Sequence, residues 1–393
     1  MRVVFTTTGS PWDSRAGVAP QTALALAEAM HRRGIDTTLV CTTEHQIPPV
    51  EECGFPVIWA PLLQPVVMGA ALSPHAAPIA WALRDLNAAA PIDIVHGQGE
   101  EMVLVCDAVP RALRVLTAHP LPRPVSHRTR TADARPPCGA SARLALELAH
   151  AVVVSGPNEM RASAAVELLA WDSVVAMERG LARRFFAEAS RYASGPATHL
   201  LFAGGTGDDP RAALLERAMD SSGHDALLPV CWIPGVSGAP RRAAAATKLP
   251  AFTAVERIRA PEDRELQRLV GRAAEILILD ASDAAAMVLR VALAMGRRPV
   301  VAPEALRSLV ISLDGLGLAV MPETVDAMRE QLRAASARGV PPAPDASVRD
   351  FARAHFAWDA VAARYAELYE RLSATGSARA IGVPESETPV SKP

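Results

Sequence analysis

Two glycine-bearing turns are the first features of this sequence that could hold a charged ligand. One is Ser14-Arg15-Ala16-Gly17-Val18, which opens an expected helix, and the other is Gly204-Gly205-Thr206-Gly207, which follows an expected strand. The N–H groups at a helix start favour an anion, and glycine allows a ligand to approach the backbone closely. Both turns are therefore candidates for binding a diphosphate, and ordinary strand–helix connections are the alternative. Asp208 and Asp209 would repel phosphate, but they are equally suited to capping the next helix.

Polar residues follow two further expected strands. His119 comes after Leu116-Thr117-Ala118, and His96 and Gln98 lie at the end of another strand, with Glu100 just beyond. Ligands gather at the carboxyl ends of strands in open α/β sheets. A neutral imidazole at His119 could hydrogen-bond a ligand hydroxyl, and the group around His96 could bind a polyhydroxylated acceptor. A loop histidine without a ligand and an acidic helix start are the structural alternatives.

Two kinds of segment alternate through the first half of the chain and must position these residues. Residues 20–33 have the apolar spacing of a helix, with Leu24, Ala27 and Met30 recurring on one face, and Gly34 is the expected C-cap. Short β-branched runs between helical stretches predict a parallel sheet with crossover helices. The expected strands cover residues 3–5, 37–41, 57–59, 92–96, 114–117 and 151–155.

The second half repeats this α/β pattern after a small, polar segment that predicts a linker. Its expected strands cover residues 199–203, 228–232, 276–280 and 299–302, and a helix is expected over 357–372. The sequence thus predicts an N-terminal Rossmann-like domain (1–186), a linker (187–198), a second Rossmann-like domain (199–352), a C-terminal helical segment (353–373) and a disordered tail (374–393).

The composition sets limits on the class of protein. A length of 393 residues favours two domains. The net charge of −2, from interspersed acids and bases, argues against a nucleic-acid partner. No apolar run reaches the roughly 18 residues of a membrane span, and the first residues are expected to form a buried strand and not a signal peptide. Five dispersed cysteines predict reduced thiols in the cytoplasm, with no zinc spacing.

In this order the segments resemble glycosyltransferase family 4, retaining enzymes of the GT-B fold, over roughly residues 1–373. Four places carry the resemblance. The first is residues 1–40, with a strand, a loop, a helix and a second strand preceded by Arg-Arg-Gly, and the second is the Asp-apolar-Val-His strand at 92–96. The third is the entry to the hinge, Val174-Val175-Ala176-Met177-Glu178-Arg179-Gly180, which leads to Phe185. The fourth is the closing segment Phe356-Ala357-Trp358 with Tyr365 and Tyr369.

The resemblance implies two Rossmann-like domains that face each other across a cleft, with the final helix returning to the first domain. It also implies that a nucleoside-diphosphate sugar binds in this cleft and that His119 faces the donor sugar. The family's two donor-binding glutamates fall on Asp283 and Val291, so one acid is shortened and the other is lost. Its diphosphate-binding arginine falls on Gly205, and its lysine falls near Pro210 or Arg211.

The remaining candidates follow from this divergent donor site. Asp283 is expected to contact donor hydroxyls, or else to cap a helix beside Ser282. The candidate donor-binding cations are Arg211 and Arg290, and Arg297 and Arg298 could also replace the missing cations. Glu304 is a weaker candidate for donor contact.

The family's chemistry is glycosyl transfer in which the leaving group departs ahead of attack on the same face of the sugar. Such a reaction needs no side-chain nucleophile, and the resemblance implies no metal or other cofactor. The expected partners are the nucleotide-sugar and a small-molecule acceptor, for instance in antibiotic biosynthesis. Three alternatives stay open: a catalytically degenerate partner or scaffold of another glycosyltransferase, a sugar-nucleotide epimerase, and an inverting family 1 transferase. An inverting family 1 transferase is expected to have a histidine as catalytic base near the first loop, and residues 9–19 contain no histidine. A homodimer is also possible.

Overall fold

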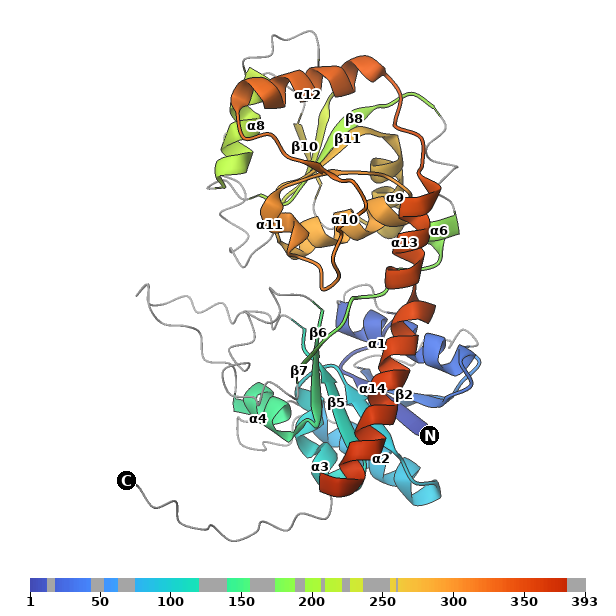
Figure 1. Ribbon diagram of the computed structural model, residues 1–393. Helices are drawn as coiled ribbons and strands as arrows, with labels where there is room; N and C mark the ends of the chain where they lie inside the picture. The colour runs from blue at the N-terminus through green and yellow to red at the C-terminus, as the bar shows by residue number, and fades with distance from the viewer. Residues whose placement is uncertain are drawn as a thin grey trace, which may run out of the picture.

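The computed structural model describes residues 1–12, 18–43, 53–62, 75–119, 140–155, 174–187, 195–205, 209–220, 227–235, 255–258 and 261–379. These residues form two α/β domains, each built around one sheet with parallel strand pairing (Figure 1). The expectation of two Rossmann-like halves is therefore confirmed.

The first domain contains a seven-stranded sheet in the order β3-β2-β1-β4-β5-β6-β7. The chain builds outward from β1 through β2 to β3 and then returns to the other side of β1 with β4. This reversal leaves a switch point between β1 and β4, where ligands of open α/β sheets bind. The strands are β1 (Arg2–Thr7), β2 (Asp36–Thr43), β3 (Val57–Pro61), β4 (Ile94–Gly97), β5 (Leu113–Thr117), β6 (Ala151–Val154) and β7 (Val174–Ala176).

Helices cover both faces of this sheet because its strands are apolar on both sides. One face carries α1 (Val18–Arg32) and the final helix α14 (Trp358–Arg379), which pack around Phe5, Met30 and Tyr369. The other face is covered by α2 (Ala76–Ala89), the 3-10 helix η1 (Glu100–Leu104), α3 (Val105–Ala108) and α4 (Ala140–Leu148).

The second domain has a six-stranded sheet in the order β10-β9-β8-β11-β12-β13, with its switch point between β8 and β11. One face packs on α9, α10 and α13, and the other on α8 and α12. The strands are β8 (His199–Ala203), β9 (Val230–Ile233), β10 (Val255–Arg257), β11 (Ala273–Ile278), β12 (Val300–Val301) and β13 (Ala319–Val320). The helices are α6 (Arg184–Ala187), α8 (Pro210–Asp220), α9 (Asp263–Arg272), α10 (Asp283–Ala294), α11 (Pro303–Leu306), α12 (Val325–Arg338) and α13 (Ala346–Phe356).

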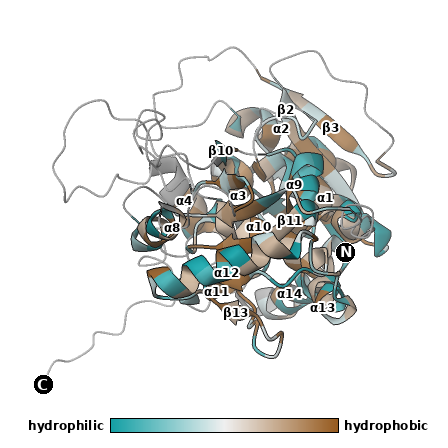
Figure 2. Ribbon diagram, turned by 90° about the horizontal axis from the view of Figure 1, so that it is seen from above, coloured by the Kyte–Doolittle hydropathy of each residue, from teal (hydrophilic) through white to brown (hydrophobic). Residues whose placement is uncertain are grey.

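Helix α12 illustrates why the outer layer folds as it does. Met328, Leu332 and Ala335 recur at helical spacing and are fully buried, while the remaining surface of the helix is largely hydrophilic (Figure 2). Thr324 caps its start, and Gly339, with φ +64°, ends it in the left-handed conformation. No helix in the described part of the chain is long and apolar enough to cross a membrane.

The chain crosses between the domains twice, and the two crossings lie side by side. The Leu181 N–H donates to the Phe356 carbonyl at 2.6 Å, and Leu181 forms an isolated parallel bridge with Ala357. A Cβ atom at Gly180 would overlap the ring of Trp358, so only glycine fits beside this tryptophan. From this crossing α14 runs along the first domain (Figure 1), where it contacts α1. The two crossings therefore form one packed hinge.

Three sequence expectations about element boundaries are corrected. The final helix continues to Arg379, so the expected tail from 374 begins inside a helix; one glycine among helix-forming residues costs only about 1 kcal/mol. The first sheet does not close with residues 151–155, because β7 pairs with β6. The strand expected over 92–96 begins at Ile94. A helix expected near residue 159, residues 188–194 of the expected linker, and residues 380–393 lie outside the described residues.

Candidate functional site

At the carboxyl edge of the first sheet, the predicted residues His119 and Gln98 come together. His119 follows β5 and Gln98 follows β4, and these strands are neighbours. His119 Nε2 lies 2.6 Å from Gln98 Oε1, and His119 Nδ1 lies 3.4 Å from a terminal nitrogen of Arg179. Arg179 comes from the hinge just after β7. The edge therefore carries a hydrogen-bonded chain of an amide, an imidazole and a guanidinium.

The protonation state of His119 follows from its partners. A guanidinium can only donate, so Nδ1 accepts and the proton resides on Nε2, which donates to Gln98 Oε1. Burial, and next the positive charge of Arg179, lowers the pKa of His119 to about 3. The ring is thus neutral at physiological pH, the form in which it can hydrogen-bond a ligand hydroxyl. Both of its ring nitrogens contact protein groups, so a ligand hydroxyl would have to replace one of these contacts.

Glu101 is a site residue that sequence reasoning missed. Its side chain is fully buried, and Oε1 accepts hydrogen bonds from the Gln98 N–H at 2.7 Å and from Thr6 Oγ1 at 3.4 Å. Burial raises the pKa of its carboxyl to about 7. Its second oxygen and the Gln98 side-chain nitrogen are both buried without a hydrogen-bond partner. The segment after β4 therefore holds polar atoms whose hydrogen-bonding capacity the protein leaves unused.

The prediction that His96 binds an acceptor is corrected. Its ring is fully buried, with Nδ1 2.6 Å from Tyr369 Oη and Nε2 2.7 Å from Thr117 Oγ1. Burial, and secondarily the charge on His119, lowers its pKa to about 3. His96 instead fastens α14 to the first sheet. Glu100, the third predicted acceptor residue, is the first residue of η1, and its side chain lies outside the described residues.

The second domain presents a tight turn at the carboxyl end of β8. Gly204 and Gly205 both have left-handed backbones, with φ of +86° and +74°. Asp280, just beyond β11, accepts the Gly205 N–H at 2.9 Å, and its other oxygen accepts from the N–H and hydroxyl of Ser282 at 2.9 and 2.6 Å. A Cβ at Gly204 would overlap Asp280 Oδ1, so the turn needs glycine. This turn lies at the switch point of the second sheet.

Asp283 lies next to this turn but does not cap a helix. The cap of α10 is Ser282, whose Oγ accepts the Ala285 N–H at 3.4 Å, and Asp283 is the first helical residue. It is exposed at the helix N-terminus. The alternative that Asp283 serves as a cap is therefore wrong. Gly17 and Thr206, predicted at the two turns, lie outside the described residues.

Two predicted donor-site residues, Arg211 and Glu304, form an ion pair. A terminal nitrogen of Arg211 lies 2.7 Å from Glu304 Oε2 and 2.8 Å from Oε1. This hydrogen bond is the main reason that the pKa of Glu304 is lowered, and the charge of Arg307 adds to it. Asp209 accepts the Arg211 N–H at 2.8 Å, so it caps α8 as one of the two sequence alternatives expected. The pair joins the starts of α8 and α11.

Arg290 is not available to a donor, and this prediction is corrected. It is 5% exposed, and its Nε donates to Glu178 Oε2 at 3.1 Å. Arg297 is similarly committed, because it donates to the carbonyls of Val270, Gly271 and Ala273. Apolar helix faces bury these guanidiniums, and a buried charge must be paired or hydrogen-bonded.

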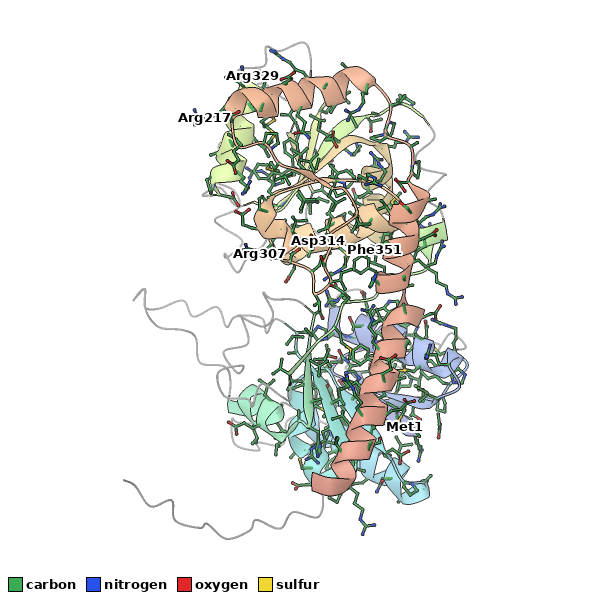
Figure 3. The ribbon with its side chains drawn as sticks, in the orientation of Figure 1. Met1, Arg217, Arg307, Asp314, Arg329 and Phe351 are labelled. Atoms are coloured by element: carbon green, nitrogen blue, oxygen red, sulfur yellow. The ribbon has the colours of Figure 1, made fainter. Side chains whose placement is uncertain are left out.

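Four arginines at the surface of the second domain, three exposed and Arg329 half-buried, differ in where they lie. Arg298 pairs with Asp345 at 2.8 Å. Figure 3 shows Arg307 and Asp314 at the end of the second domain nearer the first, while Arg217 and Arg329 lie at its far end. Arg307 therefore lies on the side of the second domain that faces the first domain, whereas Arg217 and Arg329 lie far from it.

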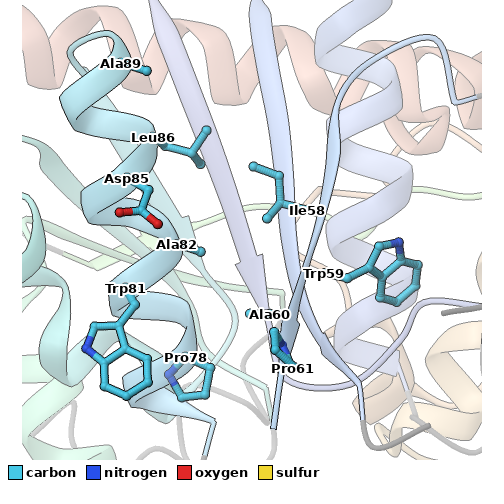
Figure 4. Close-up of a pocket in the computed structure, with 10 residues that line it drawn as sticks. All are labelled: Ile58, Trp59, Ala60, Pro61, Pro78, Trp81, Ala82, Asp85, Leu86 and Ala89. Carbon is cyan, nitrogen blue, oxygen red and sulfur yellow. The ribbon is translucent and has the colours of Figure 1, made fainter. Parts of the chain in front are cut away.

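A pocket of about 440 Å³ lies away from both switch points, between β3 and α2 (Figure 4). Its lining is mostly apolar, and Asp85 is its one charged residue. The other lining residues are Ile58, Trp59, Ala60, Pro61, Pro78, Trp81, Ala82, Leu86 and Ala89. A site without a cation does not suit a diphosphate, so we do not assign the donor to it.

Known protein structures share this architecture. No family model matches the sequence, and no curated protein sequence matches it. The structure is similar to sucrose-phosphate synthase from Thermosynechococcus elongatus, with a TM-score of 0.62 and 16% identity over 95% of this chain and 100% of that one. It is also similar to HepE from Anabaena, solved in complex with UDP-glucose, with a TM-score of 0.57 and 13% identity over 95% and 100% of the two chains.

A third similar structure is AviGT4, a glycosyltransferase involved in avilamycin A biosynthesis, with a TM-score of 0.51 and 15% identity over 94% of this chain and 98% of that one. The sheet orders, the returning α14 and these similarities define the fold as GT-B.

Proposed function

We propose that this protein is a glycosyltransferase that moves a sugar from a nucleoside-diphosphate sugar to a small-molecule acceptor. The observation that carries the proposal is the Gly204–Gly205 turn, held by Asp280 at the switch point of the second sheet. Its backbone can approach a phosphate closely, and the exposed Asp283 carboxylate beside it can accept hydrogen bonds from sugar hydroxyls. The Gly17 turn of the first domain is the proposed second contact for the diphosphate, with Thr206 and Arg211 on the opposite side.

The acceptor is proposed to bind on the first domain, beside Gln98. The unused hydrogen-bonding atoms of Gln98 and Glu101 suit a polyhydroxylated molecule, and Glu100 is retained as a third candidate. Ligand hydroxyls both donate and accept, so they can satisfy a free amide N–H and a carboxyl oxygen together. Antibiotic biosynthesis is proposed as the setting, and AviGT4, of similar fold, acts in avilamycin A biosynthesis.

Transfer is proposed to proceed with retention and without a metal or other cofactor. The bond between the anomeric carbon and the diphosphate oxygen breaks, and its electron pair leaves with the diphosphate. The acceptor oxygen attacks the same face, and its proton passes to the departing phosphate oxygen. The protein's part is to position both substrates, exclude water and stabilise the leaving charge. His119, neutral at the first-domain edge, is proposed to face the donor sugar.

A thermal-shift screen tests the proposal. UDP, GDP, dTDP and their sugars are added to the protein, since a ligand that binds only the folded state raises the melting temperature. At least one nucleoside diphosphate should raise it, and a sugar conjugate should raise it further. No shift with any of them at millimolar concentration would oppose an active enzyme and favour a partner or scaffold of another glycosyltransferase. The observation that favours this partner or scaffold role is that acidic residues pair with Arg211 and Arg290, two arginines expected to bind the donor.

A further inference from the structure

Glu101 is a fully buried carboxyl that no positive charge compensates within the described part of the chain. Burial raises its pKa, and only hydrogen bonds, from Thr6 and from backbone N–H groups, act in the opposite direction. By contrast Glu178, which is also deeply buried, is paired with Arg290 at 3.1 Å. A buried carboxylate without a partner is costly. A ligand that carries a positive charge would remove this cost at Glu101.

The unpartnered oxygen of Glu101 lies next to Gly99. Glu101 Oε2 is 3.0 Å from the point that a Cβ atom at Gly99 would occupy, and no other atom of the described residues, apart from the glycine and its chain neighbours, lies within 4 Å of that point. Gly99 is half-buried, and its φ of −179° is an extended backbone that any residue can adopt. The lack of a side chain at Gly99 therefore leaves room for a ligand atom at hydrogen-bond distance from the carboxyl. Gly97 leaves no such room, since a Cβ there would overlap Met102.

Two more buried side-chain atoms at this edge of the sheet lack hydrogen-bond partners. They are the amide nitrogen of Gln98, which is 5% exposed, and Oγ1 of the fully buried Thr7. Phe5 of β1 pairs with His96 of β4, and Thr7 and Gln98 each follow two residues later. Both therefore lie at the switch point of the first sheet, where the Gln98 N–H donates to Glu101 at 2.7 Å. The amide nitrogen donates and the hydroxyl donates or accepts, so both suit ligand hydroxyls.

We propose that Thr7, Gln98, Gly99 and Glu101 recognise an acceptor that carries a protonated amine among its hydroxyls, as an amino sugar or an aminocyclitol does. The inference rests on the proposed function and names the acceptor class for it. The ammonium group lies beside Gly99 and donates to Glu101 Oε2, while hydroxyls of the same molecule contact Gln98 and Thr7. A charge-assisted hydrogen bond is about twice as strong as a neutral one. The carboxyl therefore selects an amine over a hydroxyl at this position.

Binding of glucosamine and of glucose, measured by calorimetry on the full chain near neutral pH, compares two sugars that differ by an ammonium group in place of one hydroxyl. Wild-type protein should bind glucosamine at least about tenfold more tightly than glucose, the scale of one charge-assisted contact. Glu101→Gln keeps the size of the side chain and removes its charge, so it should bind the two sugars equally. Asp107→Asn, which removes an exposed carboxylate on α3 of the same domain, is the matched control and should keep the wild-type preference.

Gly99→Ala tests where the amine lies. The added methyl group would occupy the position 3.0 Å from Glu101 Oε2 and should weaken glucosamine binding by at least about tenfold. The melting temperature should stay close to that of the wild type, because the extended backbone at this residue accepts alanine. Saturating glucosamine should also lower the pKa of Glu101 from about 7, measured by NMR, because a nearby positive charge favours the carboxylate.

Equal affinity of the wild type for the two sugars, or binding of neither, would overturn the inference. A preference for glucosamine that persists in Glu101→Gln would place the ammonium group elsewhere and would overturn it too. In each case a rise of the melting temperature in the nucleotide screen would leave the proposed function standing. The proposed function fails on a separate result, which is that no nucleoside diphosphate raises the melting temperature.

Discussion

Glu178 and Arg290 form a buried ion pair that joins the hinge to the second domain. Their side chains are 0% and 6% exposed, and the Arg290 Nε donates to Glu178 Oε2 at 3.1 Å. The other Glu178 oxygen accepts the N–H groups of Val310 and Ile311. The segment carrying these amides lies beyond α11, which begins near Glu304. The Glu178–Arg290 pair therefore connects the hinge to the part of the second domain that follows Glu304, a proposed donor-binding residue.

Breaking this pair on one side should be costly. We expect Glu178→Gln and Arg290→Met each to lower the free energy of unfolding by about 3–5 kcal/mol, because each leaves an uncompensated group buried. The double variant should be destabilised by less than the sum of the two. Asp326→Asn, which breaks an ion pair at a residue 90% exposed, is the control and should change stability by less than about 1 kcal/mol. Urea denaturation followed by circular dichroism measures all four, and an additive double variant would show that the pair is not coupled.

Gly204→Ala should abolish nucleotide binding while the protein still folds. The added Cβ would overlap Asp280 Oδ1 and displace the carboxylate that holds the Gly205 N–H. Gly315→Ala is the matched control, because its φ of +83° imposes the same kind of backbone strain while no atom lies within 4 Å of the added Cβ. Both variants should lose about 1 kcal/mol of stability from that strain. The nucleotide-induced rise in melting temperature should disappear in Gly204→Ala and persist in Gly315→Ala. An equal rise in both variants would show that this turn does not bind the nucleotide.

Glu101 should make stability depend on pH in a particular direction. The pKa of its carboxyl is raised from 4.5 to about 7, so the folded protein binds more protons than the unfolded chain between these values. Stability from this group is therefore greatest below pH 4.5 and is lost as the pH rises toward 7. His96 and His119, with pKa values lowered to about 3, act oppositely and lose stability as the pH falls below 6.5.

A difference measurement isolates the Glu101 contribution, because Glu101→Gln keeps both histidines. The melting temperature of the wild type relative to Glu101→Gln should decline from pH 4.5 to 7 and then level off. A constant difference across that window would mean that the carboxyl does not titrate there.

The sequence predicts the sheets well where strands are long and apolar. The expected strand at 199–203 coincides with β8, and those at 37–41 and 114–117 lie within β2 and β5. Periodicity cannot find β10 and β13, which have three and two residues and are strands only because β9 and β12 pair with them. Likewise β11 starts at Ala273, whose helical propensity is overridden by pairing with β8.

The site residues likewise fall into those that local sequence predicts and those that depend on long-range contacts. Glycine turns and strand ends are local features, so the positions of Gly204, Gly205 and His119 could be read from the sequence. The partner of a charge is not local. Arg290 pairs with a residue 112 positions away, and Arg211 with one 93 positions away. Glu101 was missed because only its burial, not its neighbours in sequence, distinguishes it from Glu100.

His119→Ala and Asp283→Ala should separate the two halves of the proposed site. If His119 contacts the donor sugar, His119→Ala should lower turnover by at least roughly tenfold, which corresponds to about 1.4 kcal/mol of transition-state stabilisation. Affinity for a bare nucleoside diphosphate should change little. This neutral ring does not titrate near pH 6.5, so any change of turnover across that pH should come from Glu101 and should persist in His119→Ala.

Asp283→Ala should instead weaken binding of the nucleotide-sugar more than binding of the bare nucleotide, since its carboxylate is proposed to contact sugar hydroxyls. Ser282, not Asp283, caps α10, so this variant should lose little stability. The melting temperature therefore distinguishes a ligand contact from a structural one, with Ser282→Ala as the comparison that should lose about 1 kcal/mol as a missing cap. Equal loss of affinity for nucleotide and nucleotide-sugar in Asp283→Ala would place this carboxylate away from the sugar, and wild-type turnover in His119→Ala would remove that ring from the reaction.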